Sequence, residues 1–483
     1  MSKSSENEPM IGLEIHCQLN KLQSKLFCGC NAQFRGEEPN KYTCPVCLGL
    51  PGGLPVLNKG AVDAAIKLAH AFNSSINQRQ YFFRKNYFYP DLACGYQITE
   101  YNKGGGVAFA DGGSILINVD DDEKSIELDR FHLENDPGKI VHLGGDIESS
   151  KGSLVDYNRS GIALVEVVTK PVMQKPEEVR LFLNKLKSII SHCELIDLTK
   201  DGAMRVDVNV SIKGHSRIEV KNINSFKEAE KAVKWEIFRQ RKMIEKGQEP
   251  IQSTRNWNGQ TTSLLRAKES ESEYRYFPEA DLIPLEIDDE WIEKIKKEMP
   301  ELPDARSRRF RKDYDLSEYD ANVLMGDKYT ADFFEEACGL TDDFQAVKNW
   351  IMNDIMGILN EENKSLEESQ VKPKLLVDMI NALNKKKITT KIAKKYIPKL
   401  LEGVALKNWM KKKGVKKVTD PAVLEELADK IIAENPNVVE DLKKKPKTFQ
   451  FFIGQMMKAT RGQADIQMTR KILKNKLGKY MNE

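Results

Sequence analysis

Regular alternation of apolar and polar residues in the stretch IGLEIHCQL, residues 11–19, constrains the fold of this chain most strongly. Every second residue from Ile11 to Leu19 is apolar, while Glu14 and His16 fall between them. A period of two residues is that of a β-strand, so one face would be buried and the other would present a carboxylate and an imidazole. The stretch therefore predicts a half-buried strand with two ionisable side chains on its polar face.

The same pattern recurs in three further stretches, which places more carboxylates on polar strand faces. Asp207 lies within MRVDVNVSI, Glu219 within RIEVKN and Glu134 within RFHLEND. Gly-rich turns separate such segments, as expected for an α+β domain built on a largely antiparallel sheet. We therefore predict an α+β fold for the first part of the chain.

Helical periodicity predicts helices between these strands, and helices throughout the region after Trp291. The helices expected within the first region span 58–72, 175–192 and 226–247. A chain of 483 residues exceeds what one core usually holds, so several domains are expected. We divide it into a disordered N-terminus (1–9), an α+β domain (10–293), a helical domain (294–404) and a small helical tail (405–483).

Charge is distributed unevenly along the chain. Residues 371–483 contain about 27 Lys and Arg against about 11 Asp and Glu, which leaves roughly −13 for the rest of a chain whose net charge is +3. A basic tail would attract a polyanion such as RNA, with an affinity that falls as salt rises. A solvated, lysine-rich helical surface explains the same composition equally well.

The sequence also bears on the compartment. Apolar runs all stay well short of the roughly 18 residues that a membrane span needs. The first nine residues lack the apolar segment of a secretory signal. We therefore expect a cytoplasmic protein.

If the alternating strands are neighbours in one sheet, Glu14, His16, Glu134, Asp207 and Glu219 converge on one surface. Crowded carboxylates would take up protons unless cations balance their charge. Oxygen ligands with one imidazole suit Mg²⁺ or Mn²⁺, which in turn hold nucleotide phosphates. The sequence has no GxxxxGK[ST] loop, so ATP bound here would be held by metal and basic side chains. The alternative is that polar residues alternate on any half-exposed antiparallel sheet.

Basic and aromatic residues are interleaved in the segment 81–99. Arg84 and Lys85 stand beside three aromatic residues at 87–89, and this combination could serve phosphate binding and base stacking. An aromatic cluster of this kind is equally typical of core packing, so both interpretations stay open.

Four of the eight cysteines have the spacing of metal ligands. Cys28 and Cys30 form a CxC pair, and Cys44 and Cys47 form a CxxC pair after thirteen intervening residues. Two close pairs separated by enough chain to fold back can surround Zn²⁺ tetrahedrally. A disulfide framework is not expected without a secretory signal. We predict one structural zinc ion, with four reduced thiols as the alternative.

Seven longer motifs together carry a resemblance to a known family. In order from residue 11 to residue 465 they are IGLEIHCQL, CPVCLGLPGGLPVLN, RKNYFYPDL, DYNRSG, EVKNINSF, EYRYFPEADLIPL and IGQMMKATRGQAD. This series resembles the GatB/GatE family, which supplies one subunit of the aspartyl/glutamyl-tRNA amidotransferases, along nearly the whole chain.

The resemblance implies a ligase (EC 6.3.5.-) that uses ATP and Mg²⁺. Such an enzyme phosphorylates the side-chain carboxylate of Glu-tRNA(Gln) or Asp-tRNA(Asn), after which ammonia displaces the phosphate. It implies an N-terminal cradle similar to the glutamine synthetase and guanido kinase fold, and a YqeY-like tail that contacts the tRNA. It also implies two partners in a heterotrimer, an amidase (glutaminase) subunit that makes ammonia from glutamine and a small third subunit.

The resemblance also implies roles for particular residues. The positions that match Mg²⁺ ligands of the family are Glu14, His16, Glu134, Asp207 and Glu219. Our candidates for contacts with phosphates and with the tRNA terminus are Arg84, Lys85, Arg205 and Lys221.

Three positions depart from the family pattern. Asn135 stands where a second acid is frequent, Phe83 where many members have Asp, and Cys94 where Lys is usual. Any role assigned to these positions is therefore in doubt. Asn135 favours a competing hypothesis, a non-catalytic tRNA-binding scaffold with a degenerate nucleotide site. Ligation of free glutamate is a third hypothesis, and the basic tail fits it less well.

Overall fold

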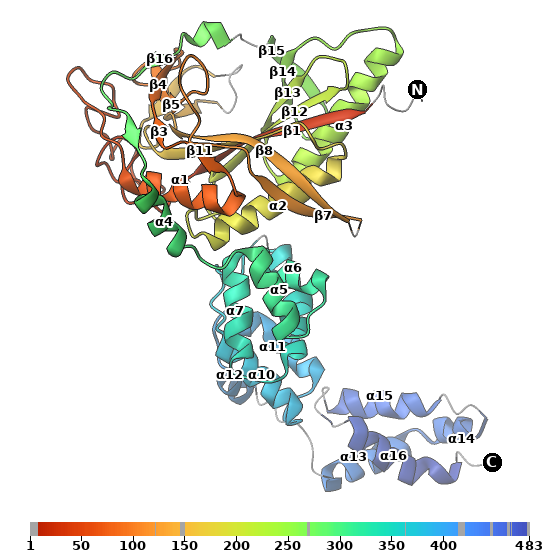
Figure 1. Cartoon of the computed structure of the whole chain (residues 1–483). Coiled ribbons are helices and arrows are strands. Elements are labelled where there is room, and N and C mark those ends of the chain that lie inside the picture. The colour runs from red at the N-terminus through yellow and green to blue at the C-terminus, as the bar shows by residue number, and fades with distance from the viewer. Residues whose placement is uncertain are drawn as a thin grey trace. The chain divides into compact units, whose positions relative to one another are not determined.

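The computed structural model describes most of the chain, in two compact units (Figure 1). The described residues are 8–120, 122–144, 150–267, 271–362, 364–413, 421–444, 448–460, 464 and 466–480. The first unit comprises Met1–Arg306 with Gly326–Lys328, and the second comprises Ser307–Met325 with Tyr329–Glu483. Among the helices of the described chain, none has the length and apolar content that crossing a membrane requires.

The first strand begins slightly earlier than expected. The expected disordered N-terminus (1–9) lies outside the described residues as far as residue 7, whereas Pro9 already pairs with Ile212 in the first strand. The strands are β1 (Pro9–Gln18), β2 (Ser75–Ile76), β3 (Arg79–Gln80), β4 (Phe82–Asn86), β5 (Tyr96–Glu100), β6 (Ala110–Asp111), β7 (Ser114–Val119), β8 (Asp122–Asn135), β9 (Lys139–His142), β10 (Ser153–Asp156), β11 (Ala163–Thr169), β12 (Met204–Ile212), β13 (Ile218–Ile223), β14 (Ser253–Trp257), β15 (Thr262–Ala267), β16 (Phe277–Pro278) and β17 (Leu285–Glu286).

Most of these strands join one large sheet. Its order is β15-β14-β13-β12-β1-β11-β8-β5-β4-β16, with β6 and β7 attached to β8 and β2 attached to β6. In the described part of the chain, β13 and β14 are the one parallel pair of this sheet, and its other pairs are antiparallel. The predicted mixed fold with a large, mainly antiparallel sheet is therefore confirmed.

Side-chain caps mark the start of most helices of the first unit. They are α1 (Lys59–Phe72), α2 (Pro176–His192), α3 (Phe226–Glu245) and α4 (Asp289–Lys297). The side chain of Asn58 accepts a hydrogen bond from Gly60 N, and that of Ser225 accepts one from Glu228 N. Each cap satisfies a backbone donor that the first helical turn leaves open. The three helices expected before residue 250 are thus present, with ends shifted by at most two residues.

The core of the first unit lies on one face of the sheet. Ile11, Leu13 and Ile15 of β1 are at most 1% exposed and pack in a single cluster with the buried sides of α1, α2 and α3. Figure 1 shows these helices covering the sheet. Because side chains alternate along a strand, the residues between them project from the opposite face. Glu14 and His16 therefore lie on the face that these helices leave open.

The second unit is helical throughout its described residues. The helices from residue 303 onward are α5 (Pro303–Asp313), α6 (Glu318–Leu324), α7 (Lys328–Cys338), α8 (Phe344–Asn349), a π-helical turn (Trp350–Ile355), α9 (Met356–Glu361), α10 (Pro373–Asn384), α11 (Thr390–Leu401), α12 (Leu406–Lys413), α13 (Pro421–Glu434), α14 (Pro436–Lys444), α15 (Phe449–Ala459) and α16 (Ile466–Leu477). They form two hydrophobic clusters, and Leu406 of α12 belongs to the first. The change from one cluster to the next thus follows Lys413.

Candidate active site and cysteine cluster

The first group of ligand-type side chains on the open face comprises His16 on β1, Glu134 on β8 and Glu166 on β11. One ligand atom from each lies within 4.8 Å of the others. β11 pairs with both other strands, so Glu166 faces His16 across one ladder and His132 across the other. His16 Nε2 lies 3.5 Å from Glu166 Oε2 and 4.0 Å from Glu134 Oε1. One imidazole and two carboxylates thus form a compact set, called the His16 group below.

Charges in the His16 group shift one another's pKa. Burial lowers the pKa of His16, but the hydrogen bond to Glu166 and the charges of Glu166 and Glu134 raise it to about 9. Burial raises the pKa of Glu134, and the charge of Glu166 adds to this effect. Burial also opposes ionisation of Glu166, but the hydrogen bond and charge of His16 outweigh it and lower the pKa of Glu166. A divalent cation could replace the His16 proton as the charge that balances the two carboxylates.

The second group comprises Glu14 on β1, Asp207 on β12 and Glu219 on β13, again with ligand atoms within 4.8 Å of one another. Glu14 faces Asp207 directly across the β1–β12 ladder. Asn209 Nδ2 donates to Glu14 Oε1 at 2.9 Å, and Thr254 Oγ1 donates to Glu219 Oε2 at 2.6 Å. Three carboxylates held in fixed positions make a site for a hard cation. We call this set the Glu14 group.

Lys221 neutralises part of the Glu14 group. Its Nζ donates to Asp207 Oδ2 and lies 3.3 Å from Glu219 Oε1. Burial lowers the pKa of Lys221, but the charges of Asp207 and Glu219 outweigh it and raise that pKa. The ammonium group therefore stands among the carboxylates, where it can also meet an anionic ligand.

The two groups are neighbours because β1 contributes to both. Glu14 and His16 are two residues apart on one strand face, a separation of about 7 Å. All five side chains predicted from the sequence thus lie on one surface of the sheet, divided between two sets. The pairing of β1 with β11 on one side and β12 on the other decides this division.

Glu166 is the residue that the sequence did not assign. It is the single charged residue of β11, whose sequence ALVEVVT is otherwise apolar apart from its terminal Thr169. A lone carboxylate in an otherwise apolar strand carries a desolvation cost and so points to a function. That signal was present in the sequence, but only the strand order shows that Glu166 meets His16 and Glu134.

The predicted phosphate contacts fall in different surroundings. Lys85 Nζ lies 5.1 Å from the ring centre of Tyr274 and 5.8 Å from that of Tyr87. Burial lowers the pKa of Lys85, but Tyr276 and the charges of Glu134 and other groups outweigh it and raise that pKa. Lys85 lies on the same sheet face as Glu134, because it faces Gln97 across the β4–β5 ladder and Thr99, two residues along β5, faces Glu134.

Arg205 also lies on the open face, because it faces His16 across the β1–β12 ladder. Its Nη2 donates to Asp136 Oδ1 at 2.7 Å, and Asp136 is fully buried. Burial lowers the pKa of Arg205, but the charge of Asp136 and their hydrogen bond outweigh it and raise that pKa. The guanidinium group is thus fixed beside the acids by a buried partner.

Arg84 lies on the opposite strand face from Lys85, as alternation requires. Its Nε donates to Glu279 Oε2 at 2.7 Å, and its Nη2 donates to Glu279 Oε1 at 2.5 Å and to Asp281 Oδ2 at 3.2 Å. The guanidinium carbon also lies 4.4 Å from the ring centre of Tyr96. The structure thus assigns Arg84 an internal ion pair, and its contact with phosphate stays a prediction.

Two of the three departures from the family pattern have clear structural roles. Asn135 Oδ1 accepts a hydrogen bond from Ile98 N at 2.7 Å, so its side chain joins β8 to β5. The centre of the buried Phe83 ring lies 5.7 Å from that of Tyr101. Both acid groups assemble without Asn135, so the feature that favoured a degenerate site does not remove a ligand from either set.

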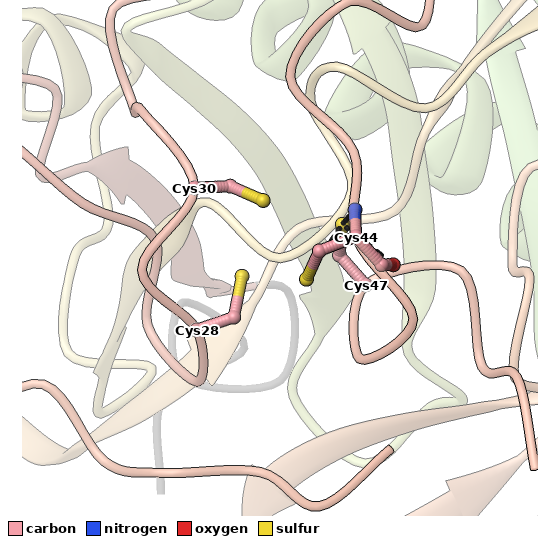
Figure 2. A group of neighbouring side chains, drawn as sticks. All are labelled: Cys28, Cys30, Cys44 and Cys47. Atoms are coloured by element: carbon pink, nitrogen blue, oxygen red, sulfur yellow. Dashed lines mark hydrogen bonds between the residues drawn. The ribbon is translucent and has the colours of Figure 1, made fainter. Parts of the chain in front are cut away.

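The four cysteines of the predicted metal site lie together (Figure 2). Cys28, Cys30, Cys44 and Cys47 offer sulfur atoms that all lie within 4.8 Å of one another. The first pair lies on one loop between β1 and α1 and faces the second pair on another, as Figure 2 shows. Cys44 N donates to Cys47 Sγ at 3.1 Å. This arrangement fits a metal ion with four thiolate ligands.

The thiols of this cluster are strongly coupled. A hydrogen bond from Cys28 lowers the pKa of Cys47 to about 5, against the opposing effect of burial and with help from the charge of Lys25. Burial raises the pKa of Cys30 to about 12, and the negative charges of Cys47 and Cys44 add to this effect. Without a bound cation, four ionised thiols would repel one another, and a metal ion removes that repulsion.

Lys25 places a positive charge beside the cysteines. It is fully buried, and its Nζ donates to Tyr42 O at 2.7 Å, to Tyr157 O at 3.3 Å and to Cys47 Sγ at 3.6 Å. A buried ammonium group is tolerated only when its donors are satisfied. Lys25 therefore ties the Cys44–Cys47 loop to the segment before β11.

Comparison with known proteins places the chain in one family. The GatB/GatE catalytic domain matches residues 9–293, and the GatB domain matches residues 332–477. The chain is 43% identical to a subunit of the aspartyl/glutamyl-tRNA(Asn/Gln) amidotransferase of Saccharolobus solfataricus, over 97% of this chain and 99% of that protein. It is 44% identical to the protein of the same name from Carboxydothermus hydrogenoformans, over 98% and 99%. It is 41% identical to the protein of the same name from Thermotoga sp., over 97% of this chain and 98% of that protein. The chain therefore belongs to the GatB/GatE family, the GatB subunits of the aspartyl/glutamyl-tRNA(Asn/Gln) amidotransferases.

Proposed function

We propose that this chain carries the kinase and transamidase site of a tRNA-dependent amidotransferase. Its substrates are ATP, ammonia and Glu-tRNA(Gln), Asp-tRNA(Asn) or both, and its products are Gln-tRNA(Gln) and Asn-tRNA(Asn). The observation that carries this proposal is the pair of ligand groups, the His16 group and the Glu14 group, side by side on one sheet face. Family membership gives independent support.

In the first reaction, the carboxylate of the charged amino acid becomes a good acyl donor. A carboxylate oxygen bonds to the γ-phosphorus of ATP, the bond from phosphorus to the bridging oxygen breaks, and ADP leaves. Mg²⁺ held by the His16 and Glu14 groups would neutralise charge on the phosphoryl oxygens. Lys221 and Arg205 border these groups and contact the phosphates. The phosphates compete with Asp207 for the ammonium group of Lys221 and with Asp136 for the guanidinium group of Arg205.

In the second reaction, ammonia replaces the phosphate. Its nitrogen bonds to the acyl carbon, the bond from that carbon to the phosphate oxygen breaks, and one proton leaves the nitrogen. Lys85 lies between tyrosine rings on the same sheet face as Glu134, so its charge holds the departing phosphate. These contacts stabilise negative charge as it develops on the leaving group.

The remaining assignments concern partners and the rest of the chain. An amidase (glutaminase) subunit delivers ammonia from glutamine, a small third subunit completes the complex, and the complex works in the cytoplasm. The α+β domain (10–293) shares the glutamine synthetase and guanido kinase fold. The helical domain (294–404) connects it to a YqeY-like tail (405–483), whose lysines bind tRNA. Cys28, Cys30, Cys44 and Cys47 hold a structural Zn²⁺.

The proposal is tested by ADP release from the assembled complex given Glu-tRNA(Gln), ATP and ammonium. We expect release that depends on the charged tRNA, and a loss of at least about 100-fold in Glu14→Ala, since metal-assisted stabilisation is worth several kcal/mol. Glu123→Ala serves as the control, because Glu123 is exposed on β8. An unchanged rate in Glu14→Ala would remove the metal site from the mechanism. Retention of tRNA without calorimetric binding of ATP would support the scaffold hypothesis instead.

A further inference from the structure

An exposed aromatic surface lies in the loop after β4. Phe88 is 78% exposed and Tyr89 is 51% exposed, although both are large apolar side chains. Two arginines border them: the guanidinium carbon of Arg275 lies 5.9 Å from the ring centre of Phe88, and Arg266 Nη1 lies 3.5 Å from the Tyr89 hydroxyl. We call these four residues the aromatic platform.

The ring of Phe88 lies against the backbone at Gly95 despite its exposure. A Cβ atom at Gly95 would lie only 3.2 Å from Phe88 Cε1, so the ring rests directly on this glycine. Gly95 also has a φ of +72°, which disfavours other residues there. The ring of Tyr89 lies edge-on to that of Tyr87, with 5.9 Å between their centres. The platform is thus a defined surface, and it leaves ring area open to a ligand.

A series of side chains leads from the platform toward the His16 group. The ring centres of Tyr87 and Tyr274 are 6.2 Å apart, and Lys85 Nζ lies 5.1 Å from the ring centre of Tyr274. Lys85 faces Gln97 across the β4–β5 ladder, and Thr99, two residues along β5, faces Glu134, so Lys85 and Glu134 lie on the same face of the sheet. A flexible ligand that lay on Phe88 and Tyr89 could therefore pass along these rings and place its end at the acids.

We infer that the aromatic platform binds the unpaired nucleotides at the 3′ end of the tRNA. This inference rests on the proposed function, since the amino acid on that end must reach the His16 group. Exposed rings stack on bases of any sequence, and nearby arginines attract the phosphates between them. A single strand has unstacked bases and a flexible backbone. It can therefore bend from the exposed platform toward the half-buried Lys85.

The inference is tested by binding of tRNA to the full-length chain at one salt concentration. The probe is fluorescently labelled tRNA(Gln), either intact or without its three unpaired 3′ nucleotides, and the measurement is anisotropy. We expect removal of these nucleotides to weaken binding by at least about 5- to 150-fold, which corresponds to about 1–3 kcal/mol for one stacked base. The double variant Phe88→Leu, Tyr89→Leu should bind intact tRNA as weakly as the unmodified chain binds the shortened tRNA. Its affinity should be the same for the intact and the shortened tRNA.

Two further variants guard against a loss of folding. Phe88→Tyr keeps an aromatic face on Gly95 and should retain the effect of the 3′ nucleotides. Phe238→Leu on α3 removes another exposed ring, 53% exposed and in the same unit, and should behave as the unmodified chain.

Several outcomes would overturn the inference. One is that the unmodified chain binds the intact and the shortened tRNA with equal affinity. Another is that removal of the 3′ nucleotides weakens binding by the double variant as much as it weakens binding by the unmodified chain. If the double variant loses the amidase partner from the complex but still binds intact tRNA more tightly than shortened tRNA, the aromatic platform is a protein interface instead. Since this assay needs no turnover, it is separate from ADP release: normal ADP release beside any of these results would leave the proposed function standing.

Discussion

Lys25 places one positive charge inside the protein beside the cysteine cluster. Four thiolates around Zn²⁺ carry a net charge of −2, and buried anions need nearby donors or cations. Lys25 would meet that need for the proposed zinc ion through its contact with Cys47. Its other two contacts are with the carbonyl groups of Tyr42 and Tyr157, which are distant in sequence. The same side chain therefore balances negative charge in the cluster and holds the surrounding loops together.

We predict that Lys25→Met weakens zinc binding by about 10- to 100-fold, the usual effect of losing a group that supports a metal ligand. Methionine keeps the length of the side chain but removes its charge and donors. Zinc affinity is measured by competition with a chromogenic chelator. Lys21→Met is the matched control, because Lys21 is exposed on the same loop. Equal chelator midpoints for both variants would contradict this role of Lys25.

Glu166 is the acid that the structure adds to the predicted ligands. We predict that Glu166→Gln lowers ADP release by at least about 100-fold and raises the Mg²⁺ concentration needed for half-maximal rate, since an amide keeps the volume but loses the charge. Glu127→Gln on β8 is the control, because Glu127 is exposed and pairs with Lys170. An unchanged Mg²⁺ requirement in Glu166→Gln would exclude it as a metal ligand.

β1 is the strand on which both acid groups depend. It lies between β11 and β12, and its buried face packs in the core while its open face carries Glu14 and His16. A change in the position of β1 would therefore separate both groups at once, since a shift by one residue turns every side chain to the other face.

We predict that Ile15→Ala lowers the free energy of unfolding of the first unit by about 2–5 kcal/mol, from lost burial and the remaining cavity. Ile15 is fully buried between Glu14 and His16 in sequence. The measurement is hydrogen exchange of the amides of β11 and β12. Ile251→Ala, at a side chain 79% exposed, should change that free energy by less than about 0.5 kcal/mol. Similar protection in both variants would contradict a central role for β1.

The hydrophobic residues of the described chain form three separate clusters. The first lies under the sheet, the second includes Phe310, Phe334 and Tyr396, and the third includes Leu424 and Phe452. The third cluster draws on residues after 420 alone, so its removal takes no member from the other two clusters.

We predict that a chain ending at Lys413 binds ATP as the full chain does but binds tRNA much more weakly. The missing segment carries many of the lysines of the basic region, so the dependence of tRNA affinity on salt should also become shallower. Calorimetry with ATP and tRNA titrations at several salt concentrations measure the two effects. Unchanged tRNA affinity and salt dependence would show that these lysines form a solvated surface.

The sequence alone determined several of the elements and the faces of their residues. Alternation in residues 204–212 predicted β12 with the bounds that it has, and Asn58 marked the start of α1. These are local properties, because a period of two residues or a capping side chain acts over a few neighbours. The same reasoning placed Glu14, His16, Glu134, Asp207 and Glu219 on polar faces, and the cysteine spacing grouped four thiols.

Only the tertiary structure decided which of these side chains meet. The strand order β12-β1-β11-β8 divided the predicted acids into two groups, brought Glu166 into one of them and placed Lys221 in the other. It also enclosed Lys25 beside the cysteines and turned Arg84 toward Glu279. Contacts of this kind join residues separated by many positions, so they depend on how whole strands pair and on which buried charges find partners.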